Sequence, residues 1–297
     1  MKRSRCGYVI LGLVLGLLVG QGASLWAEDA LETLFKLSGT TKLVGEIPGL
    51  VSMGMQMAQQ EKPIDPKELA ELQKVAEEKY AADRFMKILR EHIEKKLDQE
   101  KVNKLVSWYN GELAQRVIKA EEESAKPDKI LEMQAYVTML AQKPLPEPRL
   151  ALLKRLDAAI RGSAINENML LKVRMAMVRA MNAIQPEAKR QNEEQLKAVE
   201  ERLVGEVQQV VEQQLIGSWA YSYRDITDKD FETYVAFYET ELGREWGISL
   251  GEALSVGMEQ AGNELAKHYA EHLQKATEEA PQPAVASPVA PVASETR

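Results

Sequence analysis

Apolar residues between positions 28 and 280 recur at intervals of three and four, the spacing of amphipathic α-helices. No run of alternating β-branched residues bounded by turns predicts a strand. Helix starts are indicated by Asp65 followed by Pro66, by Asp98 and by Thr227. Further helices are expected over 30–38, 41–59, 128–142, 148–162, 165–184 and 192–220. The pattern therefore predicts an all-α protein.

One helical pattern occurs twice at an offset of 129 residues. The stretch LVSWYNGELA at 105–114 returns without a gap as YVAFYETELG at 234–243. In each copy, six positions at helical spacing form a stripe that is expected to lie on one continuous helix. All six are apolar or aromatic in both copies. The paired positions are Val102/Phe231, Leu105/Tyr234, Val106/Val235, Tyr109/Tyr238, Leu113/Leu242 and Val117/Trp246. Similarity at a fixed offset predicts a duplication, and hence two related multi-helix bundles in tandem.

Proline-rich stretches separate and end these bundles. KPLPEP at 143–148 marks the boundary between them, and the terminal PQPAVASPVAPVASETR contains four prolines, which exclude a stable helix. The predicted parts are a signal peptide (1–27), a first helical lobe (28–125), a connecting helix and proline-rich linker (126–148), a second helical lobe (149–276) and a disordered tail (277–297).

The first 27 residues have the layout of a secretory signal peptide. A basic stretch at 2–5 precedes a short apolar run at 8–19 and a group of small residues, with cleavage expected after Ala27. The predicted location is therefore the periplasm. Leu25 is a poor residue at the −3 position, so an uncleaved anchor in the inner membrane stays open as an alternative.

Cleavage would change the charge and the thiol content of the chain. Residues 1–27 contain three positive charges and no acids, so their removal moves the formal charge from −7 to −10. The single cysteine, Cys6, leaves as well, and with it any disulfide or thiolate metal site. An acidic chain has no electrostatic attraction to nucleic acid, and no integral membrane span is expected after cleavage.

The second copy of the repeat resembles a known family in its capped helix, its aromatic–tyrosine pair and the glycine that follows. The family is an exported bacterial one catalogued as domain of unknown function 2059, whose signature helix runs roughly Phe-Tyr-x-Ser-Pro-x-Gly. Phe237, Tyr238 and Gly243 match this pattern. Thr240 and Glu241 stand where the family has Ser-Pro.

The first copy resembles the same signature less closely. Trp108 and Tyr109 match the aromatic pair, but Ala114 replaces the glycine. The resemblance covers two copies, at about 28–122 and 150–275. It implies an exported all-α fold and no activity or cofactor.

The stretch HYAEH at 268–272 fits the His-x-x-Glu-His pattern of inverted zinc peptidases. His268 and His272 lie one turn apart, so both imidazoles can face one Zn²⁺ while Glu271 activates a water molecule. Few acids follow to supply a third ligand, and histidine near a helix C-terminus is favoured by the helix dipole alone. We therefore assign no metal, cofactor or catalytic residue, and retain a zinc-dependent hydrolase as the alternative function.

Methionines cluster at 53–57 and again at 169–181, and thioethers can bind Cu(I). However, Met53 and Met55 point about 200° apart on a helix of 3.6 residues per turn. Core packing is therefore the preferred interpretation.

Small residues recur every four positions at Gly243, Gly247, Gly251 and Ser255. Such a row lets another backbone come close. The expected partner is a helix of the same chain, with a homodimer through the three glycines as the alternative.

Aromatic residues form the candidate binding groove. Several lie off the buried stripes, where they can line a groove between the lobes or widen the core. The candidates are Trp108, Tyr109, Trp219, Tyr221, Phe237 and Tyr238. The function expected from the sequence is a non-catalytic binding module of the bacterial envelope, with an envelope protein, peptide or cell-wall component as partner.

Overall fold

The computed structural model describes residues 30–61 and 65–279, and it confirms the all-α prediction for them. The predicted signal peptide and most of the predicted tail lie outside these ranges. Residues 30–37 are helical, and eleven further α-helices lie within the described ranges. Their bounds are α2 Thr40–Glu61, α3 Pro66–Lys79, α4 Ala82–Lys96, α5 Gln99–Tyr109, α6 Glu112–Ser124, α7 Ile130–Leu140, α8 Glu147–Ile160, α9 Gly162–Ala183, α10 Glu193–Ser222, α11 Asp228–Glu239 and α12 Glu241–Glu279.

The three predicted helix starts are confirmed by their caps. The Asp65 side chain accepts from the Lys67 amide at the start of α3, and Asp98 accepts from an amide in the first turn of α5. Thr227 accepts from the Asp230 amide at the start of α11. At the other end of the chain, α12 continues to Glu279, so the tail predicted from residue 277 begins too early.

The expectation of one continuous helix for each repeated stripe is wrong, because both stripes are divided at the same place. In the first copy α5 ends at Tyr109, and Gly111 precedes α6. In the second, α11 ends at Glu239, and the Thr240 hydroxyl accepts from the Gly243 amide to start α12. The Thr240 side chain caps the second turn and no side chain caps the first, yet the apolar spacing continues across both.

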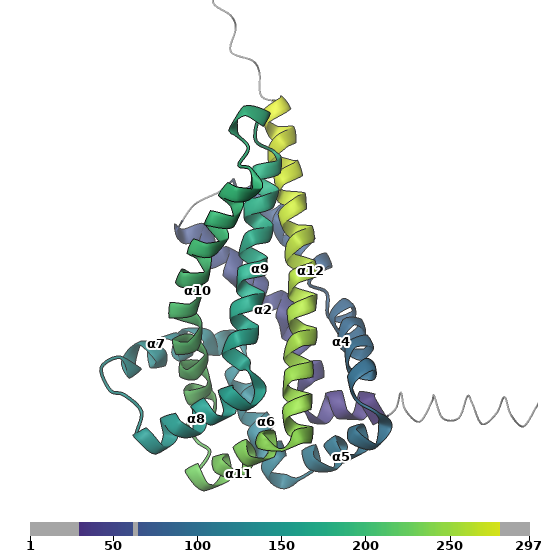
Figure 1. Cartoon of the computed structure of the whole chain (residues 1–297), viewed down its shortest axis with the longest axis vertical. Helices are drawn as coiled ribbons and strands as arrows, with labels where there is room; N and C mark the ends of the chain where they lie inside the picture. Colours follow the sequence, from purple (N-terminus) through teal and green to yellow (C-terminus); the bar gives the residue numbers. More distant parts are fainter. Residues whose placement is uncertain (1–29, 62–64, 280–297) are drawn as a thin grey trace, which may run out of the picture.

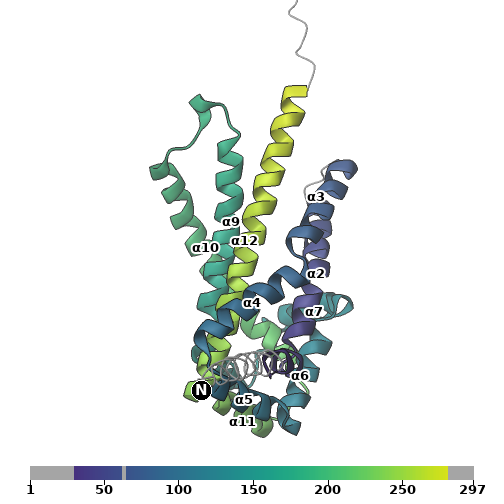
Figure 2. The same cartoon turned by 90° about the vertical axis from the view of Figure 1, so that its right-hand side faces the viewer.

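The 39-residue α12 forms the long axis of the molecule (Figure 1). It packs against α9 on one side and against α3 and α4 on the other. The hairpin of α9 and α10 and the pair α2 and α3 extend toward the same end as the C-terminus of α12 (Figure 2). The shorter helices α5, α6, α8 and α11 gather at the opposite end.

Several helices follow a similar order in the two parts of the chain, although α6 has 13 residues and α12 has 39. A residue with positive φ, Gly39 in the first part and Arg161 in the second, precedes a 22-residue helix, α2 or α9. Helices α5 and α11 begin 129 positions apart, at Gln99 and Asp228, and so do α6 and α12, at Glu112 and Glu241. The long α10 corresponds to α3 and α4 together, which are separated at Tyr80–Ala81.

Both parts contribute to one hydrophobic core. Its fully buried members include Leu34 and Leu105 from the first part and Leu153 and Trp246 from the second. Within the described ranges, no helix combines the length and apolar composition needed to cross a membrane.

The row of small residues on α12 packs within the chain. A Cβ atom at Gly243 would lie 2.1 Å from the Phe237 carbonyl oxygen, and one at Gly247 would lie 2.5 Å from a methyl of Ile160. A Cβ atom at Gly251 would lie 3.0 Å from Ile165. The close partners of this row are therefore α11, α8 and α9 of the same molecule. A homodimer through these glycines stays a prediction.

Candidate functional site

The two histidines of the predicted zinc motif face a glutamate that the sequence did not indicate. His268 lies 3.5 Å and His272 lies 3.3 Å from the carboxylate of Glu71 on α3. Glu271, the predicted base, lies 3.9 Å from Lys267. Among the described residues, no group of three or more His, Cys, Asp or Glu side chains is arranged to hold a metal ion.

The methionine clusters lie on α2 and α9, each a helix of 22 residues. Met53 and Met55 are half-buried, and Met175 is buried while Met177 is 37% exposed. The side chain of Met57 lies outside the described part of the structure.

Four of the predicted groove aromatics pack on one another across the repeat. Trp108 stacks on Phe237 with ring centroids 4.1 Å apart and planes at 10°. The hydroxyls of Tyr109 and Tyr238 lie 2.7 Å apart in the interior. In both pairs, a residue meets its counterpart 129 positions later.

The remaining two predicted groove residues, Trp219 and Tyr221, occupy different surroundings. Tyr221 is buried, with Tyr136 at its edge and the Arg224 guanidinium over its ring. Trp219 lines a cavity of about 700 Å³, which Tyr238 also lines.

This cavity is lined by elements from both parts of the chain. Its lining residues come from α2, α6 and α8 to α12, and α7 contributes Ile130 and Met133. A smaller hollow of about 130 Å³ adjoins it, and the two share Leu43, Glu121, Ala125, Tyr238 and Leu250. We call the two together the central cavity. Among the residues that the structure describes, Glu121 is the one charged residue that lines the larger space.

Glu121 ends a chain of hydroxyl groups that crosses the core. Its Oε1 accepts from the hydroxyl of Tyr223 at 2.7 Å and from that of Tyr234 at 3.1 Å. The Tyr234 hydroxyl lies 3.3 Å from that of Tyr238, which is bonded to Tyr109. Tyr109 in turn accepts from the indole N–H of Trp246 at 2.8 Å.

These contacts fix the direction of donation. A carboxylate oxygen only accepts, so Tyr234 donates to Glu121. Tyr238 then donates to Tyr234, and Tyr109 donates to Tyr238. Each link polarises the next, and the series stabilises negative charge at its Glu121 end.

Burial sets the protonation of this network. It raises the pKa of the Glu121 carboxyl above its ordinary value of 4.5, while the bonds from Tyr223 and Tyr234 partly oppose the rise. Burial also raises the pKa of Tyr238 to about 12 and holds the pKa of Tyr109 well above its ordinary value. The phenols therefore remain protonated donors at neutral pH.

Sequence reasoning missed Glu121 because it opens the acidic run Glu121–Glu123, which is typical of a solvated surface. The position was nonetheless marked by spacing. Leu113 and Val117 are separated by four residues on the buried stripe, and four more residues lead to Glu121. A carboxylate on an apolar stripe indicates a buried partner or a ligand site.

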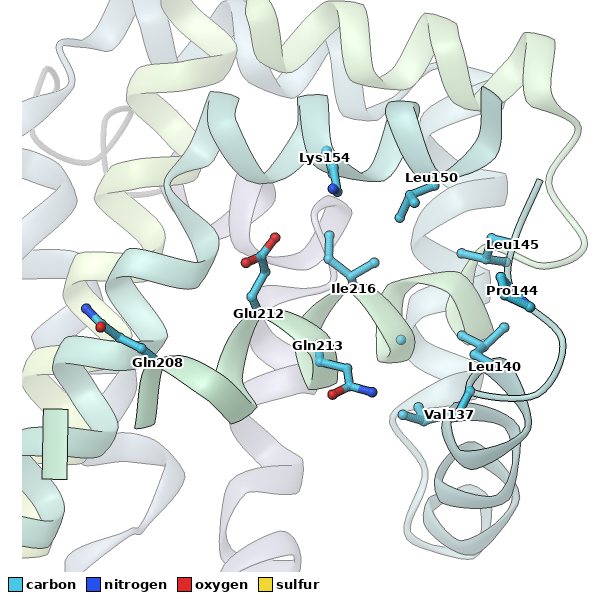
Figure 3. Close-up of a pocket in the computed structure, with 12 residues that line it drawn as sticks. Val137, Leu140, Pro144, Leu145, Leu150, Lys154, Gln208, Glu212, Gln213 and Ile216 are labelled. Atoms are coloured by element: carbon cyan, nitrogen blue, oxygen red, sulfur yellow. The ribbon is translucent and has the colours of Figure 1, made fainter. Parts of the chain in front are cut away.

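A second pocket lies beside the connecting segment, between α7, α8 and α10 (Figure 3). Its volume is about 420 Å³, and most of its wall is apolar. Leu140, Leu145 and Leu150 lie at one end, and Lys154 and Glu212 carry its charges. It lacks the converging hydroxyl groups of the central cavity.

The raised pKa of Glu121 predicts a pH-dependent loss of stability. The folded chain holds this proton more tightly than the unfolded chain, so stability falls as pH rises from about 4.5 through the folded-state pKa. Glu121→Gln should remove this fall. The free energy of unfolding of the variant, relative to that of the wild type, should therefore increase as pH rises. Urea unfolding across pH 4 to 8 measures the difference.

The matched control is Glu123→Gln on the same helix. The Glu123 carboxylate is exposed beside Lys126, which lowers its pKa, so this variant should not gain on the wild type with rising pH. An equal pH profile for wild type and Glu121→Gln would contradict a raised pKa of the Glu121 carboxyl group.

Comparison of the chain with family models, curated proteins and solved structures gave no match. The resemblance to the domain of unknown function 2059 stays a prediction.

Proposed function

We propose that this protein is a non-catalytic binding module of the bacterial envelope, and that it holds an apolar ligand in the central cavity. The observation that carries the proposal is the cavity of about 700 Å³, lined by apolar and aromatic side chains from both parts of the chain. Small-molecule sites in proteins are concave, mostly apolar and about 300–1,000 Å³ in volume, with a few polar groups that orient the ligand. Glu121 and the hydroxyls around it are such groups.

The proposal includes two related halves that arose by duplication. Matched helix starts at an offset of 129, matched 22-residue helices and the pairing of Tyr109 with Tyr238 support it. A cavity between two such halves is a common place for a ligand. The layout of residues 1–27 supports export to the periplasm, with an uncleaved inner-membrane anchor as the alternative.

Nile red, a neutral apolar dye, tests the binding proposal. We expect saturable binding to the full chain with fluorescence enhancement, because the cavity removes the dye from water. The chain has one cysteine, so Cys6→Ser gives a thiol-free background into which Ser218→Cys places a single thiol on the cavity wall. Attaching a benzyl group there through a disulfide should weaken Nile red binding at least tenfold, and reduction should restore it.

The same modification at Ser107→Cys, on the exposed face of α5, is the control and should change the affinity less than twofold. Undiminished binding after modification at residue 218 would place the dye elsewhere and contradict the proposal.

A chelator tests the alternative function, a zinc-dependent hydrolase. EDTA should leave both the melting temperature and dye binding unchanged, whereas a zinc enzyme built on His268 and His272 would be destabilised.

A further inference from the structure

The two oxygens of the Glu121 carboxyl group, which lines the central cavity, differ in their hydrogen-bond partners. Its Oε1 receives both tyrosine hydroxyls, whereas no group of the described residues bonds its Oε2. The residue is half-buried, consistent with a side chain that lines a cavity. A ligand in the cavity therefore meets a free hydrogen-bond acceptor.

The surroundings of that oxygen favour a cation. Within the described ranges, no positively charged side chain lines the larger space, and in the smaller one Lys42 is already paired with Glu122 at 2.8 Å. The aromatic residues Tyr223, Tyr234, Tyr238 and Trp219 also line the larger space, and ring faces attract cations. A buried carboxylate without a counter-charge is costly, and an ammonium group from the ligand would remove that cost.

The rest of the wall favours hydrocarbon. Leu43, Leu50, Leu156, Leu215 and Leu254 lie around the larger space, and its polar residues away from Glu121 are neutral. An apolar chain can therefore leave water along most of the cavity.

We infer that the ligand is an amphiphile with a protonated amine, whose ammonium group binds Glu121 Oε2 and whose hydrocarbon chain fills the larger part of the central cavity. The inference rests on the proposed function, because it assigns the chemical class of the ligand of that same site. The tyrosines act as positioning groups that hold the carboxyl group in place and donate to its other oxygen. A carboxylate head group would be repelled by Glu121, and a hydroxyl head group would bond it without neutralising its charge.

Three probes with the same chain and different head groups test the inference: dodecylamine, dodecanol and dodecanoate. Each is titrated below its micelle concentration against the full chain at pH 7, by isothermal calorimetry and by displacement of Nile red. We expect dodecylamine to bind at least tenfold more tightly than the other two. In Glu121→Gln, which keeps an acceptor for Tyr223 and Tyr234, the amine should lose at least tenfold in affinity while dodecanol changes less than threefold. In Glu123→Gln all three affinities should stay within twofold of the wild type.

The outcomes separate the two proposals. If the three probes bind wild type equally, or if Glu121→Gln keeps the preference for the amine, the head-group assignment is overturned and the apolar site survives. If none of the three binds and Nile red binding is also absent, the proposed function itself is wrong. The wild-type comparison needs no variant, so the test holds even if Glu121→Gln folds poorly.

Discussion

Gly243→Ala is expected to destabilise the protein by about 3 kcal/mol or more, the upper end of overpacking effects, because the new methyl would meet a backbone atom. The added Cβ would lie 2.1 Å from the Phe237 carbonyl oxygen and 2.8 Å from the Tyr238 Cα. Side chains can rotate away from a clash, but this one requires the turn between α11 and α12 to open. That turn also seats Tyr238 in the core. Urea unfolding monitored by circular dichroism measures the loss.

Two positions serve as controls for this prediction. Gly205 lies in α10, and apart from its chain neighbours and the backbone of its own helix no atom lies within 4 Å of its added Cβ. Gly205→Ala should therefore stabilise the protein by about 0.5–1 kcal/mol through helix propensity alone. The counterpart of Gly243 in the first half is Ala114, which is buried and follows a longer turn at Asn110–Gly111. A Gly243→Ala variant as stable as the wild type would show that the turn between α11 and α12 accepts a methyl group, as the turn between α5 and α6 does.

Tyr109→Phe and Tyr238→Phe are each expected to cost about 1–3 kcal/mol, because each leaves a buried donor without an acceptor. Tyr109→Phe orphans the indole N–H of Trp246, which is fully buried. Tyr238→Phe leaves the Tyr109 hydroxyl with no group to receive its proton. The free energies of unfolding of the two single variants and the double variant, from urea titrations, form a double-mutant cycle.

The double variant should cost less than the sum of the single variants by about 0.5–3 kcal/mol, the range for residues in one network. Tyr136→Phe is the control. The Tyr136 ring packs against Tyr221 in a T-shaped arrangement, and its hydroxyl is not part of the network that ends at Glu121. That variant should stay within about 0.5 kcal/mol of the wild type. Additive costs for Tyr109 and Tyr238 would mean that their hydroxyls are not coupled.

The helices were largely predictable because local spacing and caps determine them. Asp65, Asp98 and Thr227 each bond an amide in the first turn of the helix that follows. The breaks after Tyr109 and Glu239 were not predicted, because the apolar stripe continues across both turns. Periodicity shows which residues are buried and does not show where a turn interrupts the helix.

The site was less predictable, because an apolar stripe does not specify its partner. Trp108 and Phe237 were expected to line a groove, and they stack on each other. Trp219 and Tyr238 do line the central cavity. Glu121 was hidden by the acids beside it, and only the tertiary packing of α6 against α10 and α11 brings Tyr223 and Tyr234 to it.

The offset of 129 places Glu121 opposite a different residue, and this difference has a consequence for the cavity. Its counterpart is Leu250, which lines the same two spaces. Two identical halves would put a pair of carboxylates into one enclosure, where like charges would oppose each other's ionisation. In this chain one side of the cavity carries the acid and the other carries hydrocarbon. If the cavity binds the ligand that we propose, this difference should hold the ligand in one orientation.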